Sequence, residues 1–407
     1  MKGTESINSK YKGNTEETGK MKKENYRNVF AEVGISDRDV EKRLQEIVYT
    51  FFYDPEECVY RQPTEDMAYL EDTGNIDART EGMSYGMMMC VQLDMKKEFD
   101  CIWKWAKTYM FMDYGENEGY FAWSCQPDGT KNAERPAPDG EEFFAMALFF
   151  ASHRWGDGEG IFAYSREAKD ILHAAIHKGS NGRPGAPMWN NDNHQILFVP
   201  GSPFTDPSYH LPHFYELFAR WAYEEDREFF KEAVIASREH LAKACHPVTG
   251  MSAEYATFEG EPTMRETPWG RHDWFYSDSY RTVANIGLDY EWCGIDVGQR
   301  QAAERLQYFL GVTRKENPFM AYEIDGTVVE DEPALHPVGL LATTAQGTLA
   351  IPERLDGENL SETAKLAKEW VLRFYHEPMR KGERRYYDNC LYLFAFLALS
   401  GRYRIYE

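Results

Sequence analysis

The pattern of apolar and polar positions predicts a chain built mostly of helices, and these helices are of two kinds. In the first kind, apolar residues recur every three to four positions and charged residues occupy the opposite face, as in amphipathic surface helices. Residues 37–53 are the first example, because Ser36 is suited to cap a helix start and Val40 and Leu44 begin an apolar stripe. Similar stripes occupy 165–178, 226–244, 297–313 and 360–377, with Ser165 and Asp226 as the expected N-caps of the first two.

The second kind of helix is apolar or small on nearly every side. A helix without a charged face has to be covered by other elements all round. The clearest examples are Met83 to Val91, Phe143 to Ala151 and Tyr387 to Leu399, and 207–224, 275–292 and 337–351 are also sparse in charge.

The order of the two kinds of helix predicts the fold. From residue 139 onward they alternate, since each covered helix is followed by an amphipathic one; 37–53, 81–96 and 97–112 fit this scheme less cleanly. Six inner helices surrounded by six outer helices satisfy that order, and we predict an all-α fold, an (α/α)6 barrel. Neither the strand–helix alternation of a parallel α/β sheet nor a 20–50-residue repeat is visible. Two short segments, Met67 to Leu70 and Gln195 to Val199, are expected to form hairpins at the rim.

The polar start of the chain predicts its domain organisation. Residues 1–25 are polar and unpatterned, so we expect an N-terminal tail followed by a single domain over 26–407. The chain contains no run of 18 apolar residues, and its first residues lack the apolar segment of a secretory signal. We therefore expect no membrane association and a cytoplasmic location.

Charge and cysteine content exclude several classes of partner. The chain has 45 basic and 67 acidic residues, a net charge of −22, which disfavours nucleic acids and anionic membrane surfaces. The seven cysteines show no CxxC spacing, so neither a disulfide framework nor a zinc site is indicated, and most are expected to be small buried side chains. Aromatic residues make up 15% of the chain and need a core or a ligand site to hold them. Nothing in the sequence indicates the oligomeric state.

Polar residues are concentrated where the inner helices are expected to begin. The inner helices of such a barrel run parallel, so their N-termini open on one face and residues there converge on one site. The polar stretches are 77–85, 137–142, 206–213, 276–281, 335–337 and 385–388, with Trp123, Trp189 and Trp274 among the interleaved aromatics. Carboxylates beside aromatic rings in an acidic protein favour a neutral, polyhydroxylated ligand.

Glu81 is the strongest candidate for a general acid. It lies at the mouth of a very apolar helix, where loss of solvent would raise the pKa of its carboxyl. A carboxylate that stabilises a helix start is the alternative, and it applies to Asp139 and Asp278 as well. His210 and His213 have no evident third metal ligand, so capping or substrate hydrogen bonding is favoured for them over metal binding.

Several motifs together resemble glycoside hydrolase family 8, inverting enzymes built on an (α/α)6 barrel. The segment APDGEEFFAMALFFASHRW at 137–155 is similar to the family signature, with Pro138 and Glu141 as departures from it. The family members that act on the reducing ends of xylo-oligosaccharides are more similar still. The segments that carry this likeness are TEGMSYGMMM at 80–89, YFAWSCQPDGTKN at 120–132, DPSYHLPHFYELF at 206–218, SDSYR at 277–281, LHPVGL at 335–340 and RRYYDNCLYLFA at 384–395.

The resemblance implies an inverting hydrolase that releases xylose from the reducing end of xylo-oligosaccharides. Glu81 corresponds to the general acid and Asp278 to the general base that activates water, and Tyr209 would help to hold that water. Asp139 would bind the sugar in the −1 subsite, and Arg281 would orient the catalytic carboxylates.

The same resemblance implies how the reducing end is recognised. His336 would hydrogen-bond the anomeric hydroxyl of the terminal sugar, and Leu335 to Pro337 would close the cleft beyond the +1 subsite. We expect Trp123 and Tyr387 to contact the sugar as well.

General chemistry agrees with these roles. An inverting glycosidase needs an acid and a base roughly 6.5–9.5 Å apart to leave room for one water, which two acids on different inner helices can provide. This chemistry requires no metal and no cofactor. Three different functions remain open: an endo-acting xylanase with an open cleft, a sugar epimerase that uses His210 and His336, and an inactive sugar-binding protein.

Overall fold

A computed structural model describes residues 25–407 of the chain. The tail predicted for residues 1–25 therefore lies, apart from Asn25, outside the described residues. The assignment of 26–407 to a single domain stays a prediction.

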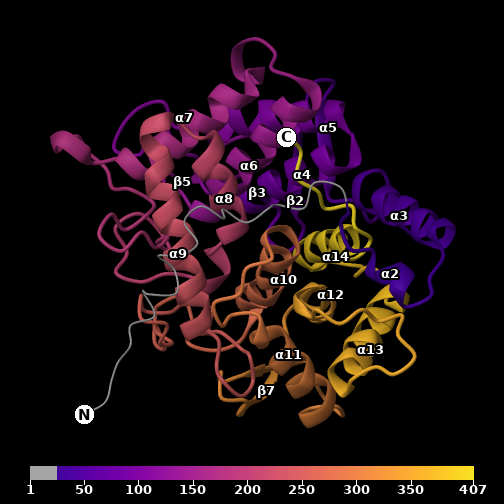
Figure 1. Cartoon of the computed structure of the whole chain (residues 1–407). Coiled ribbons are helices and arrows are strands. Elements are labelled where there is room, and N and C mark those ends of the chain that lie inside the picture. Colours follow the sequence, from indigo (N-terminus) through magenta and orange to yellow (C-terminus); the bar gives the residue numbers. More distant parts are fainter. Residues whose placement is uncertain (1–24) are drawn as a thin grey trace, which may run out of the picture.

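Six helices form the inner ring of the structure. Each contacts the next along the chain, and the last contacts the first, which closes the ring (Figure 1). Nearly all their residues are buried, as their lack of a charged face predicts. They are α4 (Thr80–Leu93), α6 (Pro138–Trp155), α8 (Pro212–Trp221), α10 (Arg281–Cys293), α12 (Pro337–Gln346) and α14 (Arg385–Leu399).

Six amphipathic helices surround this ring, and each of them packs against an inner helix (Figure 1). They are α3 (Asp37–Phe52), α5 (Lys96–Trp105), α7 (Tyr164–His177), α9 (Arg227–Ala244), α11 (Gln301–Tyr308) and α13 (Glu362–His376). Two of them end in π-helical turns, Ala106–Met110 after α5 and Phe309–Thr313 after α11. The arrangement confirms the predicted (α/α)6 barrel. The apolar pattern did not predict α2 (Val29–Glu32), because four residues are too few to show a helical periodicity.

The helix caps agree only partly with the sequence. Ser36 caps α3 as predicted, since its hydroxyl accepts a hydrogen bond from the backbone N–H of Asp39. Ser165 is not an N-cap: α7 begins one residue earlier, and the Ser165 hydroxyl donates to Asp157. Asp226 immediately precedes α9, but its carboxylate makes no capping hydrogen bond.

Two inner helices begin later than predicted. The helix expected from 207 begins at Pro212, and the helix expected from 275 begins at Arg281. Proline disfavours helical geometry in the residue before it, and Leu211 has φ −118° and ψ 63°. In the second case Ser277 has a φ of 33°, outside the right-handed helical region. Short 3-10 turns, Pro207–Tyr209 and Ser277–Tyr280, carry the polar residues there instead.

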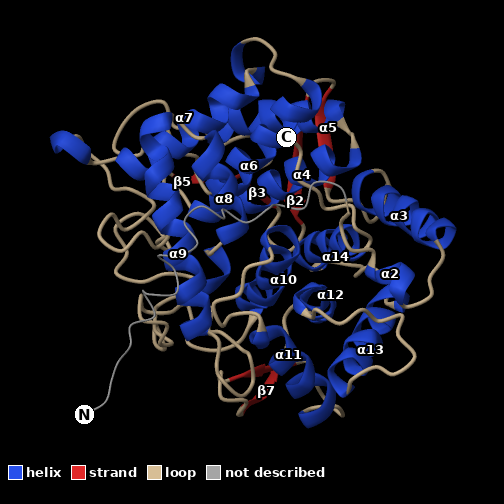
Figure 2. Ribbon diagram, viewed as in Figure 1, coloured by secondary structure: helices blue, strands red, loops and turns tan. Residues whose placement is uncertain are grey.

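Two small antiparallel sheets lie at the rim of the barrel (Figure 2). The Met67 to Leu70 strand is confirmed within β2. The Gln195 to Val199 strand is wrong, because only an isolated bridge between Trp189 and Ile196 forms there. The larger sheet has the order β1 (Tyr60–Thr64), β2 (Met67–Asp72), β3 (Asp77–Arg79), β4 (Ser124–Cys125) and β5 (Lys131–Ala133), and the smaller pairs β6 (Met320–Tyr322) with β7 (Val328–Pro333).

One continuous apolar core joins the two layers of helices. All seven cysteines are buried, as was predicted for most of them, and each is a free thiol. In the described part of the chain, no helix combines the length and the apolar character needed to span a bilayer.

Candidate active site

The guanidinium of Arg281 is the centre toward which the N-terminal ends of the inner helices converge. Its Nη1 lies 3.0 Å from a Glu81 carboxylate oxygen and 3.1 Å from one of Asp139. Its Nη2 lies 3.8 Å from Asp206 and 3.7 Å from Asp278. Four carboxyl groups from four separate segments of the chain thus surround one cation.

Glu81 is fixed by the way the chain enters its helix. Strand β3 ends at Arg79 and α4 begins at Thr80, so the sheet determines where the first helical turn lies. The hydroxyl of Tyr386, in the first turn of α14, donates to the other oxygen of Glu81 at 3.1 Å. Residue 82 must be glycine for this approach, because a Cβ there would collide with the Tyr386 hydroxyl.

Burial, together with the crowding of carboxyl groups around a single guanidinium, keeps protons in the site. Burial raises the pKa of Glu81 to about 8, although Arg281 acts in the opposite direction and Asp139 adds to the rise. Burial likewise raises the pKa of Asp139 to about 6 and that of Asp206 well above its usual range. Glu81 therefore holds its proton near neutral pH, as a general acid must.

Asp278 differs from the other three acids in its contact with solvent. Its side chain is 36% exposed, whereas those of Glu81 and Asp206 are 17% and 0% exposed. It lies on the 3-10 turn that immediately precedes α10. Water can reach this carboxylate from the outside while Arg281 holds it from within.

Glu254 supports the backbone at Asp278. One of its carboxylate oxygens accepts a hydrogen bond of 3.4 Å from the backbone N–H of Asp278. The other accepts one of 3.2 Å from the indole of Trp274 and lies 3.0 Å from Nδ1 of His272. Sequence reasoning missed Glu254, because it lies in an irregular segment with no periodic pattern to mark it.

Two tyrosines flank the central guanidinium. The rings of Tyr209 and Tyr387 have their centroids 5.5 Å and 5.9 Å from Cζ of Arg281. Both lie at starts of inner helices, Tyr209 on the turn before α8 and Tyr387 in the first turn of α14. The sequence-predicted residues Tyr209 and Tyr387 are thus brought to the same centre as the carboxylates.

His336 is positioned by a carboxylate on the neighbouring inner helix. Its Nδ1 lies 2.9 Å from Asp388, whose other oxygen accepts a hydrogen bond of 2.7 Å from the backbone N–H of Gly339. Arg380 pairs with the same carboxylate and donates to the carbonyl of Leu335 at 2.7 Å. The segment that begins α12 is therefore held at three points, two of them by Asp388 on α14 and one by Arg380 in the loop before α14. The His336 ring lies 4.7 Å from that of Tyr387.

Trp123 lies beside the start of α4. Its carbonyl accepts a hydrogen bond of 2.9 Å from the backbone N–H of Thr80, next to Glu81. The guanidinium of Arg79 lies 5.3 Å from the Trp123 ring centroid and is held by Asp72 and Asp77 at 3.1 Å each. Trp123 is only partly buried.

Neither His210 nor His213 bonds to Arg281 or to the acids around it in the described chain, although His213 lines a small cavity together with Arg281. His210 is fully buried, with hydrogen bonds of 3.0 Å to Thr205 and Ser237. His213 is 1% exposed and packs edge-on against Trp292. The preference for capping or substrate binding is wrong for His210, whose ring bonds only to core residues, Thr205 and Ser237. For His213 it stays a prediction.

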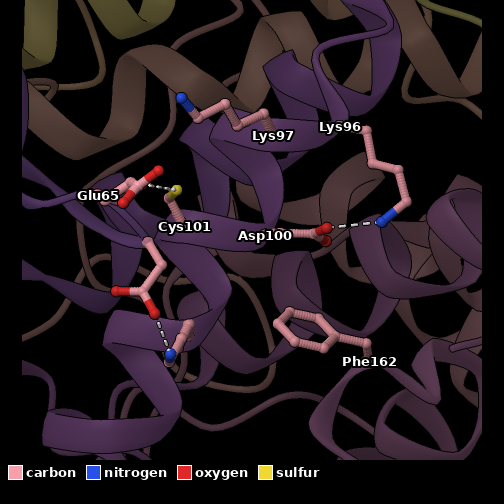
Figure 3. A pocket seen from close by; sticks show the side chains of 8 residues that line it. Glu65, Lys96, Lys97, Asp100, Cys101 and Phe162 are labelled. Atoms are coloured by element: carbon pink, nitrogen blue, oxygen red, sulfur yellow. Dashed lines mark hydrogen bonds and ion pairs between the residues drawn. The ribbon is translucent and has the colours of Figure 1, made fainter. Parts of the chain in front are cut away.

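A pocket of about 650 Å³ lies away from this centre, between the β1–β2 turn and α5 (Figure 3). Lysines and carboxylates line it, and two of the lysines pair with acids of the same pocket, Lys96 with Asp100 and Lys104 with Asp66. None of the acids around Arg281 lines this pocket, so we do not place the active site in it.

The supporting residues Asp206, Tyr386 and Asp388 stand within polar stretches that the sequence had already marked. Their individual roles were not predicted, because sequence separation conceals which side chains from different helices meet.

Comparison with known proteins identifies the family. The model of glycosyl hydrolases family 8 matches residues 69–399, which include all the acids around Arg281. The chain belongs to this family. Members of glycosyl hydrolases family 8 are hydrolases of glycosidic bonds, and the chain is such an enzyme.

Several family 8 proteins resemble this chain over nearly its whole length. A reducing end xylose-releasing exo-oligoxylanase of Halalkalibacterium halodurans is 53% identical over 382 residues, 93% of this chain and 94% of that protein. The reducing-end xylose-releasing exo-oligoxylanase Rex8A of Paenibacillus barcinonensis is 50% identical over 94% of this chain and 97% of its own length. A solved structure of Rex8A complexed with xylose matches with a TM-score of 0.87, covering 94% of this chain and 98% of that one.

Proposed function

We propose that this protein is an inverting exo-oligoxylanase that releases xylose from the reducing end of xylo-oligosaccharides. The observation that carries the proposal is the pair of unlike carboxyl groups on Arg281: Glu81, with a pKa raised to about 8, and the solvent-accessible Asp278. The activity of the relatives that are about half identical supports the same reaction, and a Rex8A variant has been solved with an arabinofuranosyl-xylotetraose.

In the proposed mechanism, Glu81 and Asp278 act on opposite faces of one sugar ring. Glu81 donates its proton to the glycosidic oxygen as the bond to the leaving xylose breaks. Asp278 removes a proton from a water molecule, which attacks the anomeric carbon from the other side and inverts its configuration. Tyr209 beside Arg281 is placed to help hold this water.

Asp139, whose pKa of about 6 leaves it ionised at neutral pH, stabilises the transition state. Positive charge develops on the sugar ring as the bond breaks, and carboxylates in a poorly solvated site stabilise it. Asp139 is the one we assign to the sugar in the −1 subsite, since it shares Nη1 of Arg281 with Glu81. Arg281 holds the acids in fixed positions relative to one another. Trp123 and Tyr387 provide aromatic surfaces against which the sugar rings can pack.

The anchored start of α12 supports cleavage at the chain end. Arg380 holds the Leu335 carbonyl, and Asp388 holds both His336 and the backbone of Gly339. A segment fixed at three points can block further sugars beyond the +1 subsite, and His336 can bind the free anomeric hydroxyl. This favours exo action over an open endo-acting cleft.

The geometry disfavours both an epimerase and an inactive binding protein. An epimerase that uses His210 and His336 requires both rings at one sugar, but His210 bonds to Thr205 and Ser237 in the core. The raised pKa of Glu81 keeps its carboxyl protonated, as a general acid requires. A protein that only binds sugar gains nothing from such a proton donor.

Anomer-resolved NMR of xylotriose cleavage tests the proposed function. We expect xylobiose and xylose in equal amounts, with the new reducing end of xylobiose appearing first as the α-anomer, because inversion of a β-linkage gives that product. Xylotriose labelled at its reducing sugar should release all the label as xylose. Label left in xylobiose, a β-anomer as first product, or rapid cleavage of polymeric xylan would contradict the proposal.

We predict that His336→Ala weakens recognition of the reducing end. Loss of one hydrogen bond to a sugar hydroxyl should lower kcat/KM by about 3- to 10-fold and reduce the preference for one anomer. A trisaccharide that lacks the anomeric hydroxyl serves as the control, since the wild type should discriminate against it and the variant should not. An unchanged anomer preference in the variant would contradict this role.

We also propose a cytoplasmic location and a part in xylan breakdown, acting on oligosaccharides that other enzymes have released from the polymer. Seven buried cysteines without a disulfide suit a reducing compartment. Cell fractionation tests this, and activity recovered mainly from the culture medium would contradict it.

A further inference from the structure

A cluster of two histidines and one aspartate joins two outer helices of the barrel. His173 and His177 lie on α7, and Asp226 lies directly before α9. Nδ1 of His173 is 2.9 Å from one oxygen of Asp226, and Nε2 of His177 is 2.7 Å from the other. None of these residues belongs to the inner layer that carries the acids around Arg281.

The three side chains have the placement of metal ligands. Their ligand atoms all lie within 4.8 Å of one another. The histidines are four residues apart on α7, so both rings project from the same face of the helix, with centroids 4.4 Å apart. One metal ion between them could replace the two protons that now bridge the rings to Asp226.

Burial and exposure also suit a metal. The Asp226 side chain is 0% exposed, so its position is fixed by the surrounding protein, whereas each histidine side chain is 44% exposed. An ion could therefore enter from solvent, bind the carboxylate at the base of the cluster, and keep at least one position for water.

The charge around the cluster attracts cations. Glu224 and Glu225 belong to the same 3-10 turn as Asp226, and Tyr223 on this segment donates to Asp170 of α7. With a net charge of −22, the whole chain adds to this attraction.

We propose that His173, His177 and Asp226 bind one divalent transition-metal ion of the Zn²⁺ type, which ties α7 to the start of α9. Two imidazole nitrogens and one carboxylate form a ligand set that suits Zn²⁺, Co²⁺, Ni²⁺ or Cu²⁺, whereas Mg²⁺ and Ca²⁺ prefer oxygen ligands. The ion stabilises the outer layer of the barrel and takes no part in hydrolysis.

Zinc titration of the untagged, chelator-treated full chain tests the proposal. Calorimetry should detect one Zn²⁺ per chain, and the midpoint of thermal unfolding should rise with Zn²⁺ concentration, because a ligand that binds the folded state stabilises it. Mg²⁺ at the same concentrations should have no such effect. Co²⁺ should give the visible absorption bands of a nitrogen- and oxygen-ligated ion.

Three variants decide whether the ion sits in this cluster. His177→Ala and His173→Ala should each weaken Zn²⁺ binding more than about 100-fold, because loss of a direct ligand exceeds the 10–100-fold cost of losing a supporting residue. His376→Ala, a change of an exposed histidine at the end of α13, should bind Zn²⁺ as the wild type does.

One further variant distinguishes zinc binding at this cluster from zinc binding at the active-site acids. Asp278→Asn should retain full Zn²⁺ affinity, whereas zinc held by the carboxylates around Arg281 would be lost there. Both outer-layer histidines are partly exposed, so we expect their alanine variants to fold and to hydrolyse xylotriose normally without metal. Equal Zn²⁺ affinity in the wild type and His177→Ala, or no Zn²⁺ binding by the wild type, would overturn the proposal.

Discussion

Glutamine in place of Glu81 is expected to lower kcat on xylotriose by about 10²–10⁴-fold, the usual contribution of a general acid. Glutamine has nearly the same shape and can still accept the hydrogen bond from Tyr386, so the fold should persist. What it lacks is the proton that the raised pKa of Glu81 retains near neutral pH. Steady-state kinetics, with circular dichroism as the measure of folding, tests this expectation.

The leaving group gives a sharper test of the same role. Xylobiosyl β-fluoride releases fluoride, which needs little protonation, so Glu81→Gln should cleave it at a rate close to that of the wild type. A loss of activity that is equally large on xylotriose and on the fluoride would show that Glu81 does something other than donate a proton.

The pH profile provides a third measurement on Glu81. Because the protonated form is active, kcat/KM of the wild type on xylotriose should fall as the pH rises through about 8. The same shift makes folding stability fall as the pH rises from the ordinary glutamate range toward 8, since the unfolded state releases that proton earlier. Glu81→Gln should therefore be the more stable protein at alkaline pH.

Glu141→Gln is the matched control for this set. Burial raises the pKa of Glu141 to about 8 as well, but its carboxylate accepts a hydrogen bond of 3.0 Å from the backbone of Phe121 and makes no pair with Arg281. We expect this variant to keep its activity. A raised pKa alone would then be insufficient to mark a catalytic acid, and position at the central guanidinium would be the deciding property.

Asparagine in place of Asp278 is expected to lower kcat by a similar factor, about 10²–10⁴-fold, because no group then removes the proton from the attacking water. This variant should lose activity on xylobiosyl β-fluoride as well, unlike Glu81→Gln, since water still has to be activated. The contrast between the two variants on one substrate distinguishes the base from the acid.

An external nucleophile tests Asp278 further. Asp278→Ala leaves space beside the sugar, and azide needs no base, so millimolar azide should restore turnover and give xylobiosyl azide of inverted configuration. Asp325→Asn is the control, because this exposed acid accepts a hydrogen bond from the backbone of Thr327 and does not pair with Arg281. Full activity of Asp278→Asn without azide would exclude the proposed base.

The barrel was predictable because helices that are buried on all sides lack charged residues, and this is visible in the sequence. Helices such as α6 and α14 carry almost no charge along their inner lengths, and the alternation with amphipathic helices gives their order. The rim was less predictable, since segments such as Gln195 to Val199 are apolar without being paired strands. Apolar character alone does not distinguish a strand from a buried loop.

The residues of the site likewise fall into those that the sequence could predict and those that it could not. Glu81, Asp139, Asp278 and Arg281 were predictable because all stand at helix starts, which the fold brings together. Glu254 was not, because its role depends on an irregular loop that returns to the turn at Asp278. The preference for His210 was incorrect, because the irregular segment before α8 places its ring between Thr205 and Ser237 in the core.

The separate anchoring of Leu335 and His336 has an evolutionary consequence. Arg380 and Asp388 hold this segment, and neither is bonded to Glu81 or Asp278 in the described chain. Mutations that loosen this segment can therefore accumulate while the acids around Arg281 keep their positions. Substitutions at the start of α12 can therefore convert an enzyme that trims chain ends into one that cuts within a polymer. In such a barrel the substrate range can change more rapidly in evolution than the reaction.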